Sequence, residues 1–361
     1  MRQFQESSVS SLTTASPRQE SDRALPMAAT RKRPAPGGGE DAGEGKRARI
    51  TLGSIYDYEK LEVLGEGSFG VVVKARHRGT GEAVAVKRAR ASDLRAVLRE
   101  AGCLAACRGH PSVVGIRDVV EDAATGDLFL VMEFVGASLR RLLRRAAAAG
   151  ARPPRVPEAR ARAVMRQLLR GAERMHGAGI IHRDIKPENI LVAPGGAVKI
   201  CDLGLATPAR QVYPERRVGT LLYRSPEQLA GHRDYGPGVD IWALGCVMAE
   251  LLTGRFMFDK ETEDAMLDRV MDLRCALAES GLRAFDEWPA FKGMPELSRG
   301  AREVLAGLLA VLPGDRLTAT AALQHPWFAE EEEEECPAAA ACGSASRAAR
   351  ISSASVVTVV V

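Results

Sequence analysis

The strongest chemical signal in the chain lies in residues 182–189, which read as a loop. This loop holds Asp184 and, five residues later, Asn189. A carboxylate and an amide at this spacing let one loop position a hydroxyl group and a metal ion together. Residues 198–201 then read as a strand that leads into a second carboxylate, Asp202. An ionised carboxylate at a strand end that faces a cleft is well placed to hold Mg²⁺.

A second set of residues could bind phosphate. Gly65, Gly67 and Gly70 follow a GxGxxG spacing between two strand-like runs, and glycines let the backbone approach a phosphate without a Cβ in the way. A dinucleotide site of the βαβ type needs a helix directly after such a loop, but residues 71–73 read as a strand. Any phosphate loop here is therefore of the hairpin kind. The spacing alone is weak evidence, because glycines are common in hairpins.

Lys87 closes the Val-Ala-Val-Lys run of residues 84–87 and follows a strand that reads as buried. A lysine in that position needs an anionic partner, either a phosphate or a carboxylate. Glu100, in the helical segment that follows, is a candidate partner. The alternative is a lysine at a strand end whose stem is buried and whose ammonium group reaches solvent.

These side chains need a scaffold, and the apolar pattern over residues 58–135 predicts its first part. Short runs rich in Val and Leu are separated by glycine-containing turns, which is typical of an antiparallel sheet. One helix is predicted over residues 92–106, with Ser92 as its N-cap. Its apolar stripe is expected to comprise four residues: Leu94, Val97, Leu98 and Ala101.

The pattern of the second part is mainly helical, with helices predicted over residues 157–176, 240–252 and 301–312. The fold class is therefore α+β. A small, mainly antiparallel β lobe with one helix (58–135) precedes a larger, mainly α lobe (139–328). The link between the two, near residues 133–138, should border a cleft. No internal repeat is visible.

Composition bounds the class of protein. The 361 residues are 46% hydrophobic and 27% charged, which fits a soluble protein with a core and excludes global disorder, a collagen, a bare coiled coil and a membrane bundle. The net charge of +4 does not by itself indicate nucleic-acid binding. Seven cysteines without CxxC spacing predict neither a disulfide framework nor a zinc site. With no signal-peptide pattern, a reducing, soluble compartment is expected.

Low-complexity segments flank the two lobes. Residues 1–57 are rich in Ser, Pro, Gly and charge, and are predicted to form a disordered arm. Its basic clusters at 31–33 and 46–49 resemble a bipartite nuclear import signal, so we expect the nucleus, with the cytoplasm as a second location. The alternative is an ordinary solvated charge run. Residues 329–361 form an acidic, low-complexity tail, and the six glutamates at 330–335 are predicted to keep it extended and mobile because like charges repel.

The order of the motifs resembles the protein kinase family over most of residues 58–328: a Gly-rich loop, VAVK, HRD…N, a DFG-like triplet and an APE-like triplet. The resemblance implies a bilobal protein kinase fold that uses ATP and Mg²⁺. It also implies that Lys87 holds the α- and β-phosphates and pairs with Glu100. Asp184 should accept the proton of the substrate hydroxyl, and Arg183 should anchor the activation segment.

Further site residues follow from the same resemblance. Phosphoryl transfer leaves little covalent work for protein groups, so their roles are positioning and charge stabilisation. Mg²⁺ should be bound by Asn189 and Asp202. The catalytic set should comprise Asp184, Lys186, Asn189 and Thr220. The ATP site should comprise Leu64, Gly65, Glu66, Gly67, Ser68, Phe69, Gly70, Val71, Val72, Lys87, Glu100, Glu133 and Val135.

Lys186, two residues after Asp184, resembles the choice of serine/threonine kinases rather than that of tyrosine kinases. Four segments together are similar to a cyclin-dependent kinase, or to a near relative such as a mitogen-activated kinase: residues 65–72, 185–191, 220–227 and 239–246. In that group, the arginine at the place of Arg224 shapes a pocket for a proline after the target residue, and Gly219 tolerates the unusual backbone needed there. The implied substrates are proteins with Ser or Thr followed by Pro, in cell-cycle or transcription-related regulation.

The activation segment departs from the family. No Ser or Thr lies between positions 208 and 219, and Glu215 occupies the place of the usual activating threonine. We hypothesise that Glu215 partly mimics a phosphothreonine by pairing with Arg183 and Arg99. The mimicry would be partial, because a carboxylate carries less charge and fewer acceptors than a phosphate. Thr207 replaces the third arginine of that cluster.

Three other departures concern regulation. In the helix that faces a cyclin in the family, only Arg99-Glu100 of residues 94–100 matches, so a cyclin-like regulatory subunit is a doubtful partner. Phe69 stands where cyclin-dependent kinases commonly carry an inhibitory tyrosine. Leu203 is the middle residue of the DFG-like triplet, and its expected role is apolar packing.

Two other classes of function compete with an active kinase. A pseudokinase scaffold would be free to lose any of four residues that are all present: Lys87, Asp184, Asn189 and Asp202. A nucleic-acid-binding protein would explain the arginines and the basic arm. The aromatic content of 5% and the lack of a recognisable reading motif speak against sequence-specific nucleic-acid binding, and no membrane partner is expected.

Overall fold

The computed structural model describes residues 52–67, 70–88, 94–150, 155–209 and 212–329. The predicted basic clusters, the acidic run and three named residues lie outside these ranges: Ser68, Phe69 and Ser92. None of the helices in the described ranges is long and apolar enough to cross a membrane.

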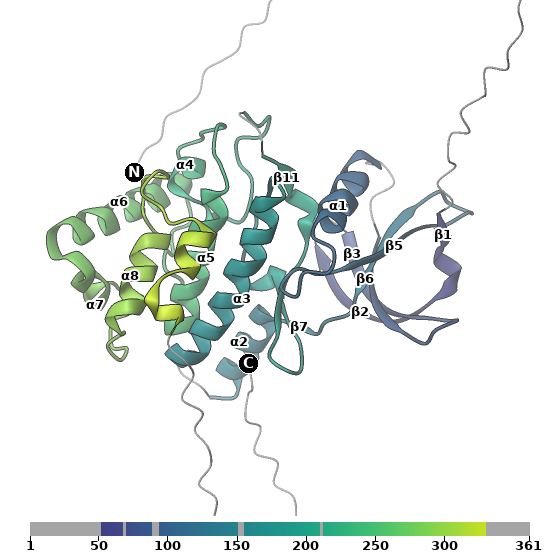
Figure 1. The fold of residues 1–361 in the computed structure, drawn as a ribbon, viewed down its shortest axis with the longest axis horizontal. Coiled ribbons are helices and arrows are strands. Elements are labelled where there is room, and N and C mark those ends of the chain that lie inside the picture. Colours follow the sequence, from purple (N-terminus) through teal and green to yellow (C-terminus); the bar gives the residue numbers. More distant parts are fainter. Residues whose placement is uncertain (1–51, 68–69, 89–93, 151–154, 210–211, 330–361) are drawn as a thin grey trace, which may run out of the picture. The chain divides into compact units, whose positions relative to one another are not determined.

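The first part of the fold is a six-stranded sheet with the strand order β1-β5-β6-β4-β3-β2. All neighbouring strands are antiparallel except β1 and β5, which are parallel. The strands are β1 (Gly53–Ser54), β2 (Tyr58–Gly67), β3 (Gly70–His77), β4 (Ala83–Arg88), β5 (Ile116–Glu121) and β6 (Leu128–Glu133). One helix, α1 (Leu94–Ala106), packs against β5 and β6 (Figure 1). The predicted antiparallel sheet with a single helix is confirmed.

The sheet begins before the predicted start of the lobe. Residues 53–57 were expected to belong to the disordered arm, but Gly53–Ser54 pairs with β5 and Ile55–Asp57 forms a 3₁₀ turn, η1. The Ser54 side chain accepts a hydrogen bond from the backbone N–H of Tyr56, and the Tyr56 hydroxyl donates to Asp122 at 2.8 Å. Residues 53–57 therefore belong to the sheet and its first turn rather than to a disordered arm.

The expected apolar stripe of α1 is wrong in two of its four positions. Leu94 and Leu98 are 53% and 56% exposed. The face that packs inward instead carries Val97, Glu100, Cys103 and Leu104. The helix turns this face toward the sheet because the carboxylate of Glu100 reaches Lys87, as described below.

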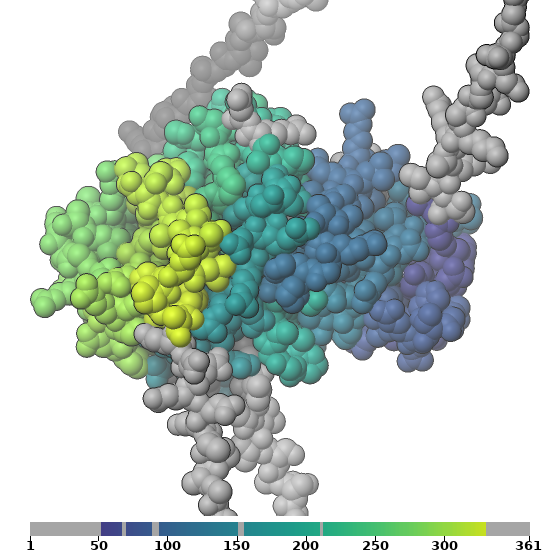
Figure 2. Space-filling view, in the orientation of Figure 1, coloured from purple at the N-terminus to yellow at the C-terminus, as the bar shows by residue number. Residues whose placement is uncertain are grey.

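The second part of the fold is mainly helical, as predicted. Its helices are α2 (Leu139–Ala148), α3 (Glu158–Gly177), α4 (Pro226–Leu229), α5 (Gly238–Thr253), α6 (Glu263–Ser280), α7 (Ala284–Glu287), α8 (Arg299–Leu308) and α9 (Ala319–Leu323). Every residue of α5 after Gly238 is buried, so this helix is the centre of the core. α3 packs against α5 and α9, and Figure 2 shows the yellow surface of α9 beside the teal surface of α3. α8 ends four residues before the predicted Leu312.

Short strands and 3₁₀ turns position the loops between the helices. β9 (Ile190–Val192) pairs with β7 (Ala137–Ser138) and β10 (Val198–Ile200), and β8 (Ile180–Ile181) pairs with β11 (Thr207–Pro208), all antiparallel. The 3₁₀ turns are η2 (Pro187–Asn189), η3 (Leu203–Leu205), η4 (Leu221–Tyr223), η5 (Gly281–Arg283) and η6 (Pro326–Phe328). Residues 182–189 therefore lie between two paired strands, which fix both ends of this loop.

A buried ion pair holds Glu227, at the end of the activation segment, which runs from Asp202 to Glu227. The Arg316 guanidinium donates to both carboxylate oxygens of Glu227 at 2.7 and 2.9 Å, and its Nη1 also donates to the carbonyl of Gly238 at 2.8 Å. A bidentate contact of this kind fixes orientation as well as distance. It fastens the residues after Thr220 to α5.

Candidate active site

Lys87 is surrounded by two carboxylates. Its Nζ lies 2.8 Å from Glu100 Oε1 and 2.7 Å from Asp202 Oδ1, and the residue is only 5% exposed. The alternative of a lysine that reaches solvent is therefore wrong, and the partner is the glutamate expected from the sequence. Burial disfavours the ammonium, but the two carboxylates outweigh it and raise the pKa of Lys87. Burial also opposes the charge of Asp202, yet Lys87 holds the pKa of Asp202 below its usual value.

Gly204, the residue after Leu203, lies close against the ion pair of Lys87 and Asp202. A Cβ at this position would lie 3.2 Å from Lys87 Nζ and 3.3 Å from Asp202 Oδ1. Any side chain would crowd the ion pair. Leu203 itself is fully buried in the core, as expected of its apolar packing role.

The glycine-rich segment forms the β2–β3 hairpin, in which Gly67 faces Gly70. A Cβ on Gly70 would lie 2.3 Å from the carbonyl oxygen of Arg88, and its φ of +116° also requires glycine. Val72 pairs with Gly65 on one side and with Lys87 on the other. The register therefore places the hairpin directly beside Lys87. The other predicted hairpin residues lie in the same two strands: Leu64, Glu66 and Val71.

The other three predicted catalytic residues each lie within hydrogen-bonding distance of Asp184. Asp184 Oδ1 accepts hydrogen bonds from the backbone N–H and the hydroxyl of Thr220 at 3.0 and 2.7 Å. Lys186 Nζ lies 2.8 Å from both Asp184 Oδ2 and Thr220 Oγ1. The amide nitrogen of Asn189 donates to the backbone carbonyl of Asp184 at 2.9 Å and to its Oδ2 at 3.2 Å. Asp184 is thus held in one orientation by three neighbours.

Buried polar groups that were not among the predicted site residues hold the loop at residues 182–189 in place. Asp240, in α5, accepts hydrogen bonds from the backbone N–H groups of His182 and Arg183, both at 2.9 Å, and its Oδ2 lies 2.9 Å from His176 Nε2. Burial opposes its charge, but the hydrogen bond from His176 keeps the pKa of Asp240 below its usual value. The sequence did contain a signal for this role: Asp240 is an aspartate within an apolar helix, and a buried charge must have polar partners.

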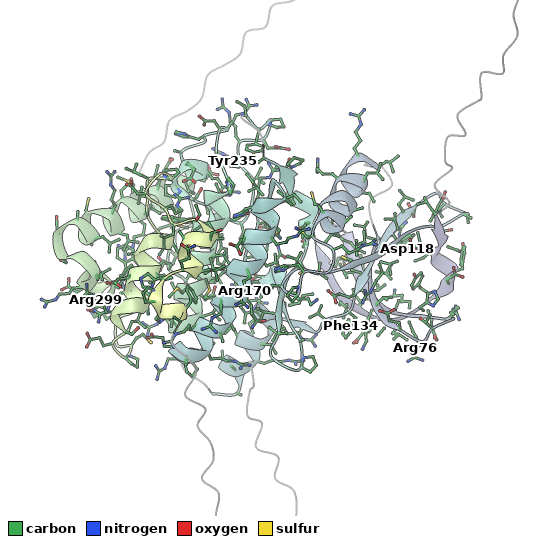
Figure 3. The ribbon with its side chains drawn as sticks, in the orientation of Figure 1. Arg76, Asp118, Phe134, Arg170, Tyr235 and Arg299 are labelled. Carbon is green, nitrogen blue, oxygen red and sulfur yellow. The ribbon has the colours of Figure 1, made fainter. Side chains whose placement is uncertain are left out.

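The link between the two parts of the fold joins them through Glu133. Its Oε1 accepts a hydrogen bond from the backbone N–H of Gly115 and contacts Lys199 Nζ, both at 2.7 Å. Phe134 follows (Figure 3). Lys74 Nζ lies 4.5 Å from the centre of its ring. Val135 then packs against the core. The predicted ATP-site residues Glu133 and Val135 therefore lie on the link, at the end of the strand that pairs with β4.

The activation segment is attached to Arg183. Arg183 Nη1 lies 3.2 Å from Glu215 Oε2, and Nε donates to the carbonyl of Leu205 at 2.9 Å. Partial burial opposes it, but hydrogen bonds from its own backbone and from Arg183 hold the pKa of Glu215 below its usual value, and Arg99 adds attraction. Thr207, at the place of the third arginine, is buried in β11.

The segment then turns at Gly219, whose φ is +86°. A Cβ there would lie 2.4 Å from the carbonyl oxygen of Arg183, so only glycine fits. The turn directs the Gly219 carbonyl toward Arg224, whose Nε donates to it at 2.8 Å. Arg224 also pairs with Glu263 of α6.

A family model of the protein kinase domain matches residues 58–328. The chain belongs to the protein kinase family. A protein kinase domain uses ATP and acts on protein substrates. The sheet with one helix followed by a helical part is the bilobal kinase fold.

Its relatives are cyclin-dependent kinases. The kinase is 41% identical over 319 residues to a protein of Oryza sativa subsp. japonica named "Putative cyclin-dependent kinase F-2", and the aligned residues cover 80% of this chain and 94% of that protein. It is 35% identical over 310 residues to cell division control protein 2 homolog 3 of Trypanosoma brucei brucei, and the aligned residues cover 79% of this chain and 96% of that protein. It is 33% identical over 302 residues to cyclin-dependent kinase B2-2 of Arabidopsis thaliana, and the aligned residues cover 77% of this chain and 94% of that protein. The kinase spans only 42% of cyclin-dependent kinase G-2 of rice.

The residues present fit a nucleotide with Mg²⁺. Asp202 is partly exposed and ionised, and the two hydrogen bonds from the amide nitrogen of Asn189 leave its oxygen to face elsewhere. Within the described ranges, no group of three or more His, Cys, Asp or Glu residues could hold a metal. Mg²⁺ usually takes one or two protein ligands and completes its shell with phosphate and water, so a pair such as Asn189 and Asp202 is a suitable set.

Proposed function

We propose that this kinase is a magnesium-dependent, proline-directed serine/threonine kinase that acts in the nucleus, in cell-cycle or transcription-related regulation. The hydrogen bond from Arg224 to the Gly219 carbonyl supports the substrate preference. This carbonyl, one residue before Thr220, is already bound by Arg224. A substrate residue whose backbone N–H pointed there would find no acceptor and would be penalised. Proline has no N–H and loses nothing.

The chain's own residues divide the work of phosphoryl transfer. Asp184 takes the proton from the substrate hydroxyl, and Thr220 holds one of its carboxylate oxygens in place. Lys186, beside the other oxygen, stabilises charge on the transferred phosphoryl group. Asn189 and Asp202 would hold Mg²⁺, which neutralises the phosphate oxygens when bound. Lys87, oriented by Glu100, would contact the phosphates nearer the adenosine.

A peptide assay tests the preference. We expect the purified chain to phosphorylate a Ser-Pro peptide about tenfold more efficiently than its Ser-Ala counterpart, since a backbone N–H left without an acceptor costs about that factor. Arg224→Met should erase most of this preference. Arg217→Met is the matched control, because Arg217 also pairs with Glu263, at 2.9 Å, but is 75% exposed. Equal rates on both peptides with the unaltered chain would refute proline direction, and no activity on either would favour the scaffold.

Glu215→Ala tests the mimicry of a phosphothreonine. We expect the activity of unphosphorylated enzyme to fall about two- to fivefold, because a half-exposed ion pair contributes little. The lowered pKa of Glu215 means that its charge is complete above the ordinary carboxyl pKa and is lost only as pH falls through the lowered value. The effect should therefore be constant from pH 6 to 8, whereas a phosphate would change charge near pH 6.

The control for this variant is Glu261→Ala, which removes an exposed carboxylate of the same lobe. Rates measured at pH 6, 7 and 8 with mass-verified unphosphorylated protein give the comparison. If Glu215→Ala matches the unaltered enzyme at every pH, the carboxylate does not stand in for a phosphate.

An obligatory cyclin-like subunit is not part of the proposal. In the family the corresponding helix faces a cyclin, yet here Glu100 already contacts Lys87 within the single chain, at 2.8 and 3.0 Å. A pull-down with a panel of cyclins, followed by activity measurements of the chain alone, would decide this point. Strong activation by one cyclin would show dependence.

A further inference from the structure

Tyr213 is a buried side chain of the activation segment, and the residues on either side of it are exposed. Tyr213 is 1% exposed, whereas Val212 is 59% exposed and residues 214–217 lie on the surface. The Tyr213 ring belongs to a small cluster, separate from the main core, with Ile181, Tyr235 and Val239. A lone buried aromatic in an exposed segment has the form of an anchor.

The anchor is a stack of two tyrosines. The rings of Tyr213 and Tyr235 are 4.6 Å apart between centres and 21° from parallel, and Tyr235 lies on the loop before α5 (Figure 3). The backbone N–H of Tyr213 donates to the carbonyl of Arg233 at 2.8 Å, and its own carbonyl accepts from Arg233 Nε. Backbone and side chain of Tyr213 are thus both fixed to the loop at residues 233–235.

The same stack holds Arg183. Its guanidinium lies 5.4 Å from the centre of the Tyr213 ring, and Nη1 donates to the Tyr235 hydroxyl at 3.4 Å. Arg183 directly precedes Asp184, and its carbonyl lies against Gly219. A displacement of Tyr213 would therefore reach both the base and the turn that presents Thr220.

The expected effects of removing the Tyr213 ring and the Glu215 carboxylate differ in size. An ion pair with a carboxylate that is 48% exposed shifts an equilibrium by at most about fivefold. Truncation of a fully buried aromatic ring shifts it by about a hundredfold or more. The buried ring outweighs the surface carboxylate.

We propose that Tyr213 is the principal positioning residue of the activation segment, holding Gly219 and Thr220 against Asp184 without any phosphate on the segment. This inference rests on the proposed kinase function, with Tyr213 acting through Arg183 and Gly219 rather than on substrate. The Glu215–Arg183 pair is then an accessory contact.

The test compares Tyr213→Ala and Tyr213→Phe with Glu215→Ala in unphosphorylated protein. We expect Tyr213→Ala to lower kcat/KM for a Ser-Pro peptide by about twentyfold or more. KM for ATP should stay within about twofold, because Lys87 and Asp202 do not contact this cluster. Tyr213→Phe keeps the ring and should retain activity within about threefold. A loss no larger than that of Glu215→Ala, or an equal loss in the phenylalanine variant, would overturn the proposal.

Limited trypsin digestion gives a readout that needs no catalysis. Cleavage after Arg216 and Arg217 reports release of the segment, and cleavage after Arg299, whose side chain is 86% exposed on α8, reports general loosening (Figure 3). In Tyr213→Ala, the first rate should rise about tenfold relative to the second. Parallel rises would show a merely structural role and refute the proposal.

Tyr213→Leu guards against a variant that fails to fold. Leucine keeps the buried apolar contact but cannot stack on Tyr235, so its activity should lie between those of the phenylalanine and alanine variants. Leucine activity equal to that of phenylalanine would show that the ring is not required. If the unaltered chain phosphorylates no peptide, the proposed function fails, while the trypsin rates still decide whether Tyr213 anchors the segment.

Discussion

Asp184→Asn should lower kcat for a Ser-Pro peptide by about 10³-fold, within the range for loss of a positioned general base. Asparagine has nearly the shape of aspartate, so the contacts with Thr220 and the loop can largely persist. The amide, however, cannot accept the substrate proton, and it removes the negative charge that faces Lys186 at 2.8 Å. KM for ATP should change by less than about threefold, since Lys87 and Asp202 are untouched.

Initial rates at saturating ATP give kcat, and the thermal midpoint shows whether the variant is folded. Asp118→Asn is the matched control, because Asp118 is an exposed carboxylate of β5 (Figure 3) and should leave both quantities unchanged. Activity of Asp184→Asn within tenfold of the unaltered chain would mean that Asp184 is not the base.

The parts of the site that could be predicted depend on local signals. Glycines at positions 65, 67 and 70 between two apolar runs are enough to predict the β2–β3 hairpin, and the structure contains it. The need of a buried lysine for a negative partner is likewise general, and Lys87 contacts Glu100 as expected. Such predictions succeed because the reason for each residue lies within a few positions of it or in its own charge.

The orientation of α1 could not be predicted in this way. Its hydrophobic spacing favours a stripe with Leu94 and Leu98, yet both are exposed. Glu100 is instead buried, because its carboxylate contacts an ammonium on a strand thirteen residues earlier in the chain. The buried stripe of α1 instead runs through Val97, Cys103 and Leu104. Periodicity carries no information about Glu100, the charged member of the same face, whose partner lies on another element.

Other contacts of the site join segments that are far apart in sequence. Arg140 of α2 donates to Glu188 at 2.7 Å and to the Tyr223 hydroxyl at 2.6 Å, and pairs with Glu250 of α5. None of these residues stands out by type in an arginine-rich chain. The role of Tyr213 could not be predicted from the sequence either, because only the fold brings the ring of Tyr235 against that of Tyr213. The fold is thus readable from the sequence pattern, while the contacts that hold the candidate site together are set by tertiary packing.

Lys87→Met should abolish measurable phosphorylation, with a loss of about 10²-fold or more, and should also destabilise the fold. Methionine matches the lysine stem, so packing against the sheet is kept and the charge alone is removed. Glu100 and Asp202 would then face each other across a buried site without a cation. Breaking one partner out of a buried ionic cluster costs about 3–5 kcal/mol. Lys74→Met, which removes a more exposed lysine 3.5 Å from Glu62, should cost less than about 1 kcal/mol.

The pH dependence of this stability loss distinguishes charge from packing. The raised pKa of Lys87 keeps its contribution complete below the ordinary lysine pKa, and that contribution is lost only as pH rises through the raised value. The lowered pKa of Asp202 keeps its contribution complete above the ordinary carboxyl pKa, and that contribution is lost as pH falls through the lowered value. Burial raises the pKa of Glu100 above its usual value even beside Lys87, so Glu100 is the first of the two carboxylates to take up a proton as pH falls. The difference in unfolding free energy between the unaltered chain and Lys87→Met should therefore be level at about pH 8 to 9. It should shrink as pH falls through the raised pKa of Glu100, where protonation relieves the repulsion between Asp202 and Glu100. A difference that stays the same under acid would assign the loss to packing around the side chain rather than to its charge.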